Sequence, residues 1–465
     1  MGAPTTDAGL LGLYKTWYTP KEIQSLLFRD SPALKKFGTK AMRIGGKEYA
    51  YAMLYGRGGA VAGDATVAAA VAATTAKVAE AKAGIGKIFS IFNITDLEKM
   101  ASMESRGAYA PAAIMKMFAA TEGARKTLAS ALYGSGFGEI TNVNGAVLAG
   151  ASTMIVDDVI GFEVGTRFVV TTTGSATALP SSALVGGGTG TVFTVSAIDD
   201  ATDTVTFSPV APAGGFVDNA WVNLAGSRDG SGNGLLPEGL GALIPSYFDR
   251  TGADWTAYVG TAFRGVTRSA AVSRLCGNFV LQGGAEKKAD ALTRGLRAAR
   301  RQGGDPDMIV INDKDYADIV GELQTNTTYW QSINQSGQKD ENEVTRGLKA
   351  AGFMFSTNFV GVVYDDPFCP KGKAYILDSS SIDLVSITDA EKINKTQVPD
   401  NNPGAENVLA VKDSTDQPYQ LNIEDYITIQ PASLVADGAG AQVIINEFMN
   451  FVCYAPAHNA VVNFV

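Results

Sequence analysis

Residues 289–311 read ADALTRGLRAARRQGGDPDMIVI and open the stretch, ending at Asp378, that decides the fold. Leu292, Leu296 and Ala299 recur at helical spacing, which predicts a helix over 289–299 with one buried face. Together with the strands that follow it, this helix predicts a compact α/β core that carries no evident catalytic group.

Stop signals and short apolar runs alternate after this helix. Gly303-Gly304 ends the helix, and Pro306 prevents it from resuming. Met308–Ile311 predicts a short buried strand. Asn312 can cap the next helix, because its side chain can accept a backbone N–H of the first turn. A further strand is predicted at 374–378.

Composition and charge exclude several classes of protein. A length of 465 residues suggests about three domains, and a formal net charge of −9 argues against a basic nucleic-acid binder. Cys276, Cys369 and Cys453 are far apart and odd in number, so neither a disulfide framework nor a zinc site is expected. We find no signal peptide and no apolar run long enough for a bilayer, which predicts a reducing cytosol and no membrane.

The first segment predicts an arm and a long helix. In the arm, residues 1–40, the aromatic side chains of Trp17 and Tyr18 pack either on their own subunit or on a neighbour. Residues 99–138 then contain a helix predicted over 112–133, which spans roughly 30 Å at the usual rise per residue.

Residues 41–98, between the arm and this helix, predict a long hairpin. Residues 48–55 read as one strand, 87–93 as the returning strand, and 60–83 as a tip of small residues. An isolated hairpin is marginal in water, so we expect another chain to stabilise it. The alternative is a disordered, alanine-rich loop.

The composition changes over residues 139–235, where charges thin out and Gly, Thr, Ser and Val dominate. Apolar and polar residues alternate at 167–170, 193–196 and 204–208, which predicts short strands of a small β-barrel or sandwich. Residues 199–203 join the last two strands as a hairpin. Both ends of the segment are rich in glycine, as expected of a domain inserted into a loop of a host fold.

The chemistry of an enzyme is not evident. His458 is the one histidine, so a Ser–His–Asp triad would have to use it, yet it stands beside Pro456 with no carboxylate at ligand spacing. The glycine-rich loops lack the features of phosphate sites. Residues 229–234 begin like a calcium loop, but Leu240 stands where a bidentate Glu is needed. We therefore predict no catalytic, metal-binding or cofactor-binding residue.

The concentrated positive feature is a run of basic residues over 287–301. Arg294, Arg297 and Arg301 share one helical face. This face is either solvated, or it contacts an acidic neighbouring subunit or phosphates. The candidate inter-subunit contacts are therefore Trp17, Tyr18, Arg57, Arg294, Arg297 and Arg301.

Several motifs follow one another in a suggestive order: GLGALIP at 239–245, RRQGGDPD at 300–307, GVVYDDP at 361–367 and KGKAYIL at 371–377. With the arm, hairpin, long helix and inserted β domain, this order resembles a tailed-bacteriophage major capsid protein. The fold of that family, the Hong Kong phage capsid fold, is shared with encapsulins. The resemblance covers most of the chain outside 139–235.

The resemblance implies an α+β capsid fold with peripheral and axial domains. Its parts would be an extended loop at 41–98, the peripheral domain with its spine helix at 99–138, a peripheral-to-axial connection at 236–275, the axial domain at 276–385 and the peripheral return with the C-terminal strand at 386–465. The inserted domain at 139–235 is not general to the family, and we expect it on the outer surface, where it contacts neighbours or a decoration protein.

The function implied is structural. Family members form homo-hexamers and homo-pentamers that tile an icosahedral shell around packaged double-stranded DNA, without sequence-specific contacts, so we expect a virion capsid assembled in the host bacterial cytoplasm. Because the sequence begins at Met1, we expect a separate scaffolding protein, along with a portal. The alternatives are an encapsulin-like compartment and a β-rich surface or adhesion protein, against which the missing export signal argues.

Overall fold

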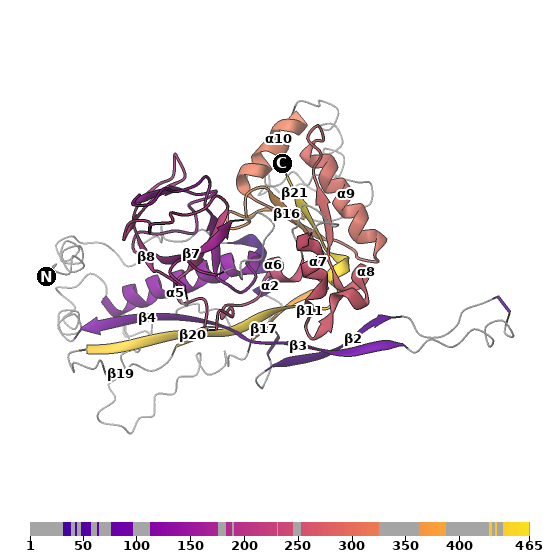
Figure 1. Ribbon diagram of the computed structural model, residues 1–465. Helices are drawn as coiled ribbons and strands as arrows, with labels where there is room; N and C mark the ends of the chain where they lie inside the picture. Colours follow the sequence, from indigo (N-terminus) through magenta and orange to yellow (C-terminus); the bar gives the residue numbers. More distant parts are fainter. Residues whose placement is uncertain are drawn as a thin grey trace, which may run out of the picture. The chain divides into compact units, whose positions relative to one another are not determined.

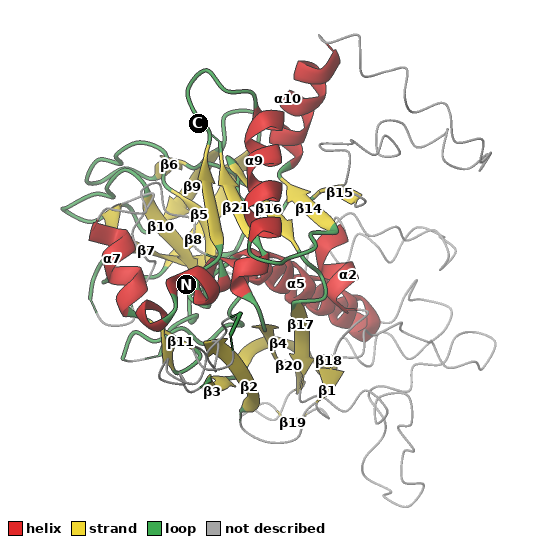
Figure 2. Ribbon diagram, turned by 90° about the vertical axis from the view of Figure 1, so that its right-hand side faces the viewer, coloured by secondary structure: helices red, strands yellow, loops and turns green. Residues whose placement is uncertain are grey.

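The structure is a computed structural model, shown in Figures 1 and 2. It describes residues 31–38, 42–43, 48–56, 63–64, 76–95, 112–174, 183–187, 190–229, 231–244, 253–324, 362–386, 427–429, 433–434 and 440–464. The chain divides into two compact units. One comprises the described parts of 87–128 and 386–449, and the other those of 31–86, 129–385 and 450–465.

A five-stranded mixed sheet lies at the centre of the second unit, in the order β13-β21-β16-β14-β15. Its strands are β13 (Asn278–Leu281), β14 (Met308–Ile311), β15 (Val362–Asp365), β16 (Lys373–Leu377) and β21 (Ala460–Asn463). Helices α9 (Lys288–Arg301) and α10 (Asp313–Gln324) share one apolar core with a single face of this sheet. The predicted α/β core is confirmed, and β21 enters it as an interior strand.

The local signals for this core act as predicted. Leu292, Leu296 and Ala299 are at most 1% exposed, so the predicted helix face is the buried one. The same face passes close to the sheet at Gly295, where a Cβ atom would lie 2.5 Å from Ile376 Cδ1. Asn312 caps α10, since its Oδ1 accepts the backbone N–H of Lys314 at 3.0 Å.

The predicted long helix is α5 (Ala112–Tyr133), and its bounds are those expected. Leu128 and Leu132 on its predicted stripe are fully buried. In the first unit, the long strand β20 (Gly440–Cys453) pairs with short partners and with a strand that precedes α5. These are β4 (Gly86–Thr95), β18 (Ile427–Ile429) and β19 (Ser433–Leu434). In the second unit, β17 (Ile382–Ser386) pairs with β1 (Met42–Arg43), and the end of β20 joins this sheet.

The hairpin consists of β2 (Tyr49–Gly56) and β3 (Lys77–Ala83), which form a two-stranded antiparallel sheet. The predicted pairing of 48–55 with 87–93 is therefore wrong. Residues 87–93 do form a strand, but they belong to β4, which pairs with β20. Each large inward side chain of β2 stands opposite an alanine of β3, as Tyr51 stands opposite Ala81. Alanine thus acts as a strand residue here because its small size lets a tyrosine pack across from it.

The inserted domain is a six-stranded sheet in the order β5-β10-β7-β8-β9-β6. Its strands are β5 (Glu139–Asn142), β6 (Thr153–Ile155), β7 (Arg167–Gly174), β8 (Phe193–Asp199), β9 (Thr204–Ser208) and β10 (Ala220–Leu224). A bridge between Val143 and Val156 joins its two outer strands, so the sheet closes into a barrel. The hairpin predicted at 199–203 is confirmed.

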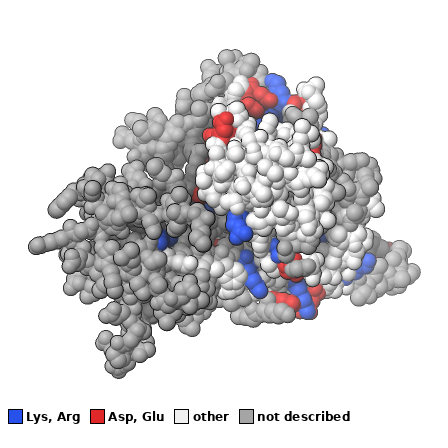
Figure 3. All heavy atoms as spheres, turned by 60° about the vertical axis from the view of Figure 1, so that its left-hand side comes forward, with Lys and Arg blue, Asp and Glu red and all other residues white. Residues whose placement is uncertain are grey.

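Four aromatic rings fill the barrel: Phe168, Phe193, Phe207 and Phe216 are each at most 2% exposed and lie in mutual ring contact. Figure 3 turns forward the side on which the barrel lies in Figure 1, and shows a broad described surface with few charged residues. This agrees with the scarcity of charge over 139–235 in the sequence.

The two ends of the barrel leave the host fold side by side. The N–H of Leu236 donates to Gly136 O at 3.2 Å, and the N–H of Gly239 donates to Gly134 O at 3.1 Å. Gly239 is required at this crossing, because a Cβ atom there would lie 2.2 Å from two carbonyl oxygens of α5. Neighbouring ends are the geometry expected of an inserted domain.

The segment between the barrel and β13 is built from short elements around one buried arginine. They are α6 (Leu240–Leu243), α7 (Ala253–Gly260), β11 (Ala262–Phe263), β12 (Val266–Thr267), η2 (Arg268–Ala270) and α8 (Val272–Leu275). The Arg268 guanidinium lies 4.1 Å from the Tyr258 ring centroid and donates to Ala242 O at 3.0 Å. The remaining short helices are α2 (Pro32–Gly38) and η6 (Pro456–His458). The domain boundaries expected from the sequence stay predictions.

Candidate functional site

The first candidate surface is the outer face of the β2–β3 hairpin. Its inner face is occupied within the chain, since the Tyr51 hydroxyl donates to Cys453 O at 3.0 Å and the Tyr49 and Tyr454 hydroxyls lie 3.2 Å apart. On the outer face, Leu54 and Val78 stand opposite one another and are 64% and 59% exposed. A pair of large apolar side chains left in solvent at one place indicates a contact surface.

The second candidate surface is the arginine face of α9. Arg294 is engaged within its own chain, because its Nη2 donates to Leu281 O and to Glu286 Oε2, both at 2.6 Å. These bonds place the arginine face along β13, the edge strand of the five-stranded sheet. Arg297 and Arg301 are exposed on the same helix face. Trp17, Tyr18 and Arg57, the other candidate contacts, lie outside the described residues.

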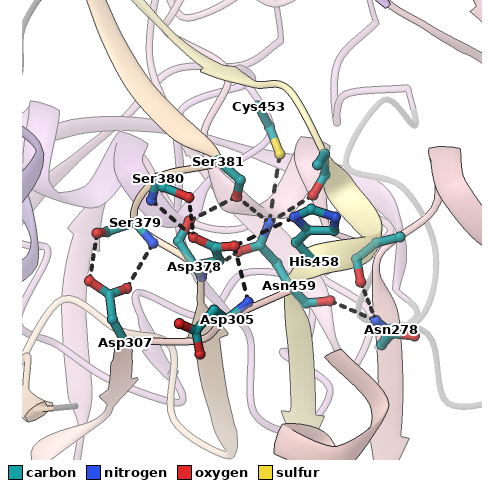
Figure 4. Close-up of polar contacts among 12 residues, drawn as sticks. Asn278, Asp305, Asp307, Asp378, Ser379, Ser380, Ser381, Cys453, His458 and Asn459 are labelled. Atoms are coloured by element: carbon teal, nitrogen blue, oxygen red, sulfur yellow. Dashed lines mark hydrogen bonds and ion pairs between the residues drawn. The ribbon is translucent and has the colours of Figure 1, made fainter. Parts of the chain in front are cut away.

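A set of hydrogen-bonded polar residues, most of them buried, lies at the junction between β16 and β17 and was not predicted from the sequence. We call it the polar hub, and Figure 4 shows it. It consists of Asn278, Asp307, Asp378, Ser379, Ser380, Ser381 and Asn459. The residues come from four separate parts of the second unit, so the hub is a structural joint between chain segments that are distant in sequence.

Two aspartates fix the turn that follows β16. Asp378 Oδ1 accepts the backbone N–H of Ser380 at 3.1 Å and the Ser380 hydroxyl at 2.5 Å. Asp307 does the same for Ser379, accepting its N–H at 2.8 Å and its hydroxyl at 2.6 Å. Side-chain carboxylates commonly close turns in this way. The turn is therefore held from its own strand and from the loop before β14.

Asn459 ties this turn to the segment that follows β20. Its Oδ1 accepts the N–H of Asp378 at 2.9 Å, and its Nδ2 donates to Ser381 Oγ at 2.9 Å and to Ala455 O at 3.2 Å. The Asn459 carbonyl accepts both the N–H and the Nδ2 of Asn278, at 3.0 and 3.1 Å. Asn459 is fully buried, so these hydrogen bonds take the place of those that its polar groups would make with water.

His458 lies beside the hub in an arrangement unlike that of a hydrolase. Its Nδ1 lies 3.5 Å from Asp378 Oδ2, which also accepts the N–H of Asp305 at 3.3 Å. The Ser380 hydroxyl and the imidazole both point at Asp378 (Figure 4). A catalytic triad needs the imidazole between the nucleophile and the carboxylate, and that order is not met here.

The cysteines give no nucleophile within the described residues either. All three are buried, and burial raises the pKa of the Cys453 thiol to about 12 and that of Cys369 well above its ordinary value. A thiol with a raised pKa stays protonated at neutral pH and is a poor nucleophile. Across the described parts of the chain, no group of three or more His, Cys, Asp or Glu residues could hold a metal ion. In the calcium-like loop, Asp229 accepts the N–H groups of Ser231 and Asn233 at 2.9 and 2.8 Å, so its carboxylate closes the turn.

None of the helices in the described part of the chain combines the length and the apolarity that crossing a membrane requires. No family model matches the chain, and no curated protein does. The solved structures do provide a match. The chain is similar to the capsid asymmetric unit of cyanophage A-1(L), with a TM-score of 0.53 and 13% identity, over 97% of this chain and 96% of the other.

The chain has the fold of a phage capsid protein. The predicted α+β capsid fold is thereby confirmed. Other solved structures are similar at lower scores. They include the capsid of a native GTA particle, with a TM-score of 0.46 and 8% identity over 100% of both chains. An encapsulin complex from Synechococcus elongatus has a TM-score of 0.43 and 7% identity, over 99% of this chain and 96% of that one.

Proposed function

We propose that this protein is a major capsid protein, a non-enzymatic structural subunit of a phage head. The observation that carries the proposal is the capsid fold extending over 97% of the chain and 96% of the matched cyanophage subunit. Such subunits act through their surfaces, so their function lies in contacts between copies.

We propose that the β2–β3 hairpin makes one of these contacts. Its tyrosine face packs against its own subunit, whereas Leu54 and Val78 remain in solvent. A two-stranded hairpin is marginal unless further surface covers it. Burial of the Leu54–Val78 pair against a neighbouring copy would supply that cover. Trp17, Tyr18 and Arg57 are proposed as further contacts, together with the α9 arginines Arg294, Arg297 and Arg301.

The assembly proposed is a shell of homo-hexamers and homo-pentamers around double-stranded DNA, formed in the bacterial cytoplasm. A separate scaffolding protein and a portal belong to this proposal, and the barrel at 139–235 is proposed as a platform for a decoration protein. The net charge of −9 supports a wall that does not bind packaged DNA strongly.

The test is to shorten the hairpin without disturbing its strands. Residues 57–76 connect β2 to β3, and an Asn-Gly type I′ turn can join Gly56 to Lys77 in their place. We expect the wild type, expressed with its scaffolding protein, to form large hollow shells in negative-stain electron micrographs. The shortened variant should stay soluble and folded but form none.

A contrasting control removes a much longer segment from elsewhere in the chain. Replacing 139–235 by a short linker between the adjacent ends should leave the host fold and shell formation intact. Wild-type protein that stays monomeric with its scaffold would contradict the proposed function. Small, uniform shells that form without a scaffold and hold protein cargo would favour the encapsulin-like alternative.

A further inference from the structure

Arg264 stands in a turn whose backbone conformation does not suit an arginine. β11 and β12 pair through Phe263 and Val266, so Arg264 and Gly265 make up a two-residue hairpin loop. Their φ angles are 51° and 97°, and positive values at both positions are typical of a type I′ turn, which favours asparagine, aspartate or glycine. A non-glycine residue in this region is strained, and it persists where the surrounding structure holds it. The groups that hold Arg264 therefore indicate its role.

The guanidinium of Arg264 is held on the body of the subunit. Its side chain is 6% exposed, its Nη1 forms an ion pair with Glu238 Oε2, and its Nη2 donates to Phe451 O at 3.0 Å. Glu238 is itself fixed beside β20, because its N–H donates to Asn450 Oδ1 at 2.8 Å. Hydrogen bonds from a charged donor are the stronger ones. The side chain therefore anchors the β11–β12 turn to the chain crossing at the root of the barrel and to the end of β20.

The backbone of the same turn holds the β2–β3 hairpin. Arg264 O accepts the N–H of Lys82 in β3 at 3.0 Å, and Figures 1 and 2 show β11 close to β3. A Cβ atom on Gly265 would lie 3.9 Å from Glu80 O, so the turn runs along β3. The guanidinium also lies near β2, since burial raises the pKa of the Tyr51 hydroxyl and the positive charge of Arg264 acts to lower it. Arg264 thus connects both strands of the hairpin to the body.

The bond to Lys82 restrains a movement that the other attachments of the hairpin restrict less. Tyr49 and Tyr51 reach the body through side chains, which stand perpendicular to a sheet, and the carbonyl of Gly84 after β3 accepts a hydrogen bond at 2.6 Å. Backbone N–H groups point along the sheet, and β2 occupies the other edge of β3. The bond from Lys82 to Arg264 therefore opposes a sideways swing in the plane of the hairpin.

We propose that Arg264 is a positioning residue, which fixes the direction in which the β2–β3 hairpin leaves its own subunit. It does so by tying the edge of β3 to Glu238 and Phe451 through a single residue. This inference rests on the proposed function, because a fixed direction brings Leu54 and Val78 to one defined place on a neighbouring copy. Asparagine would suit the turn, but it carries neither the positive charge nor the forked donors that the two acceptors receive here.

The test measures the direction of the hairpin in the unassembled subunit. All three native cysteines are buried, so spin labels can be attached to cysteines introduced at exposed positions, by Lys77→Cys in β3 and Ala285→Cys before α9. Lys77 lies about 17 Å beyond Lys82 along the strand, so a sideways swing of about 15° moves its label by about 4 Å. Double electron–electron resonance should give a narrow distance distribution for the labelled protein with Arg264 intact.

Arg264→Gly should widen this distribution by about 4 Å or more, because glycine keeps the turn but loses the anchor. Asn219→Gly is the matched control, since Asn219 of the barrel also has a positive φ, and it should leave the distribution unchanged. If Arg264→Gly does not fold, Arg264→Lys takes its place, because lysine keeps the charge without the fork, and its distribution should again be wider.

The unaltered distribution in Arg264→Gly, or in Arg264→Lys where the glycine variant does not fold, would overturn the inference. Sedimentation velocity of the unlabelled variants separates this result from the proposed function. A wider distribution together with a later onset of shell formation is the expected result. A wider distribution with unchanged shell formation would support the role of Arg264 and contradict the proposed contact of the hairpin.

Discussion

The double substitution Leu54→Ser with Val78→Ser tests whether the outer face of the hairpin is an assembly contact. Complete burial of a Leu or Val side chain contributes about 1.5–3 kcal/mol. Since 64% and 59% of these residues remain exposed in the subunit, a neighbour could still recover about 1–2 kcal/mol from each. The pair would then contribute about 2–4 kcal/mol per contact, which corresponds to a contact weakened about 30- to 700-fold.

The assay compares assembly with subunit stability. Sedimentation velocity across a concentration series should show the onset of shell formation shifted to higher concentration, or lost, in the double variant. The free energy of unfolding of the unassembled double variant should stay within about 0.5 kcal/mol of the wild-type value, because both side chains are already in water. Met53→Ala is the contrasting control: Met53 is 6% exposed on the other face, so its loss should cost subunit stability, about 2–5 kcal/mol. Shells that form from the double variant at the wild-type concentration would refute the reasoning.

Three further predictions concern stability. Burial raises the pKa of the Asp157 carboxyl, so ionisation there costs stability as the pH rises through the raised pKa; Asp157→Asn should be more stable than the wild type at pH 7 in thermal melts, with the gap closing toward the ordinary value of 3.8. Asn459→Ala leaves the N–H of Asp378 without its acceptor and should cost about 1–3 kcal/mol in urea unfolding, and an unchanged midpoint would show that the hub is not structural. Gly239→Ala should fold poorly, because its Cβ would lie 2.2 Å from two carbonyl oxygens. Gly321→Ala on α10 is the control: a Cβ atom there meets no other atom within 4 Å, so it should stabilise the helix by about 0.5–1 kcal/mol. Similar melting curves for these two variants would contradict the crossing described at Gly239.

Elements with a strong local pattern could be predicted from the sequence. The bounds of α5 at 112 and 133 and those of β14 at 308 and 311 are the predicted ones. In each case the residues carry the whole signal, through apolar spacing within the element and glycine, proline or asparagine at its ends. The hairpin at 199–203 and the inserted nature of the barrel were predictable for the same reason.

Features that depend on distant partners were not predictable. β3 contains one β-branched residue among alanines and charged residues, so nothing in 77–83 itself favours a strand. It becomes one because Tyr49 and Tyr51 need small partners across the sheet. The hub had one local signal, the Asp378-Ser-Ser-Ser run that suits a turn, but its partner Asn459 is 81 residues away. Contacts between copies leave even less signal in the sequence. A surface residue is compatible with the fold of its own subunit whether or not a neighbouring copy covers it.

The place of β21 in the sheet has a consequence for when the subunit can mature. β21 lies between β13 and β16, so it supplies an interior strand from residues 460–463. A ribosome must therefore release these residues before the sheet can close, although the strands on either side were synthesised about 80 residues or more earlier. The sheet stays open until residues 460–463 have left the ribosome, however early its other strands are made. A nascent chain that lacks β21 would therefore have an incomplete sheet and no complete assembly surface. Nascent chains on the same messenger RNA would then not assemble with one another before β21 is made.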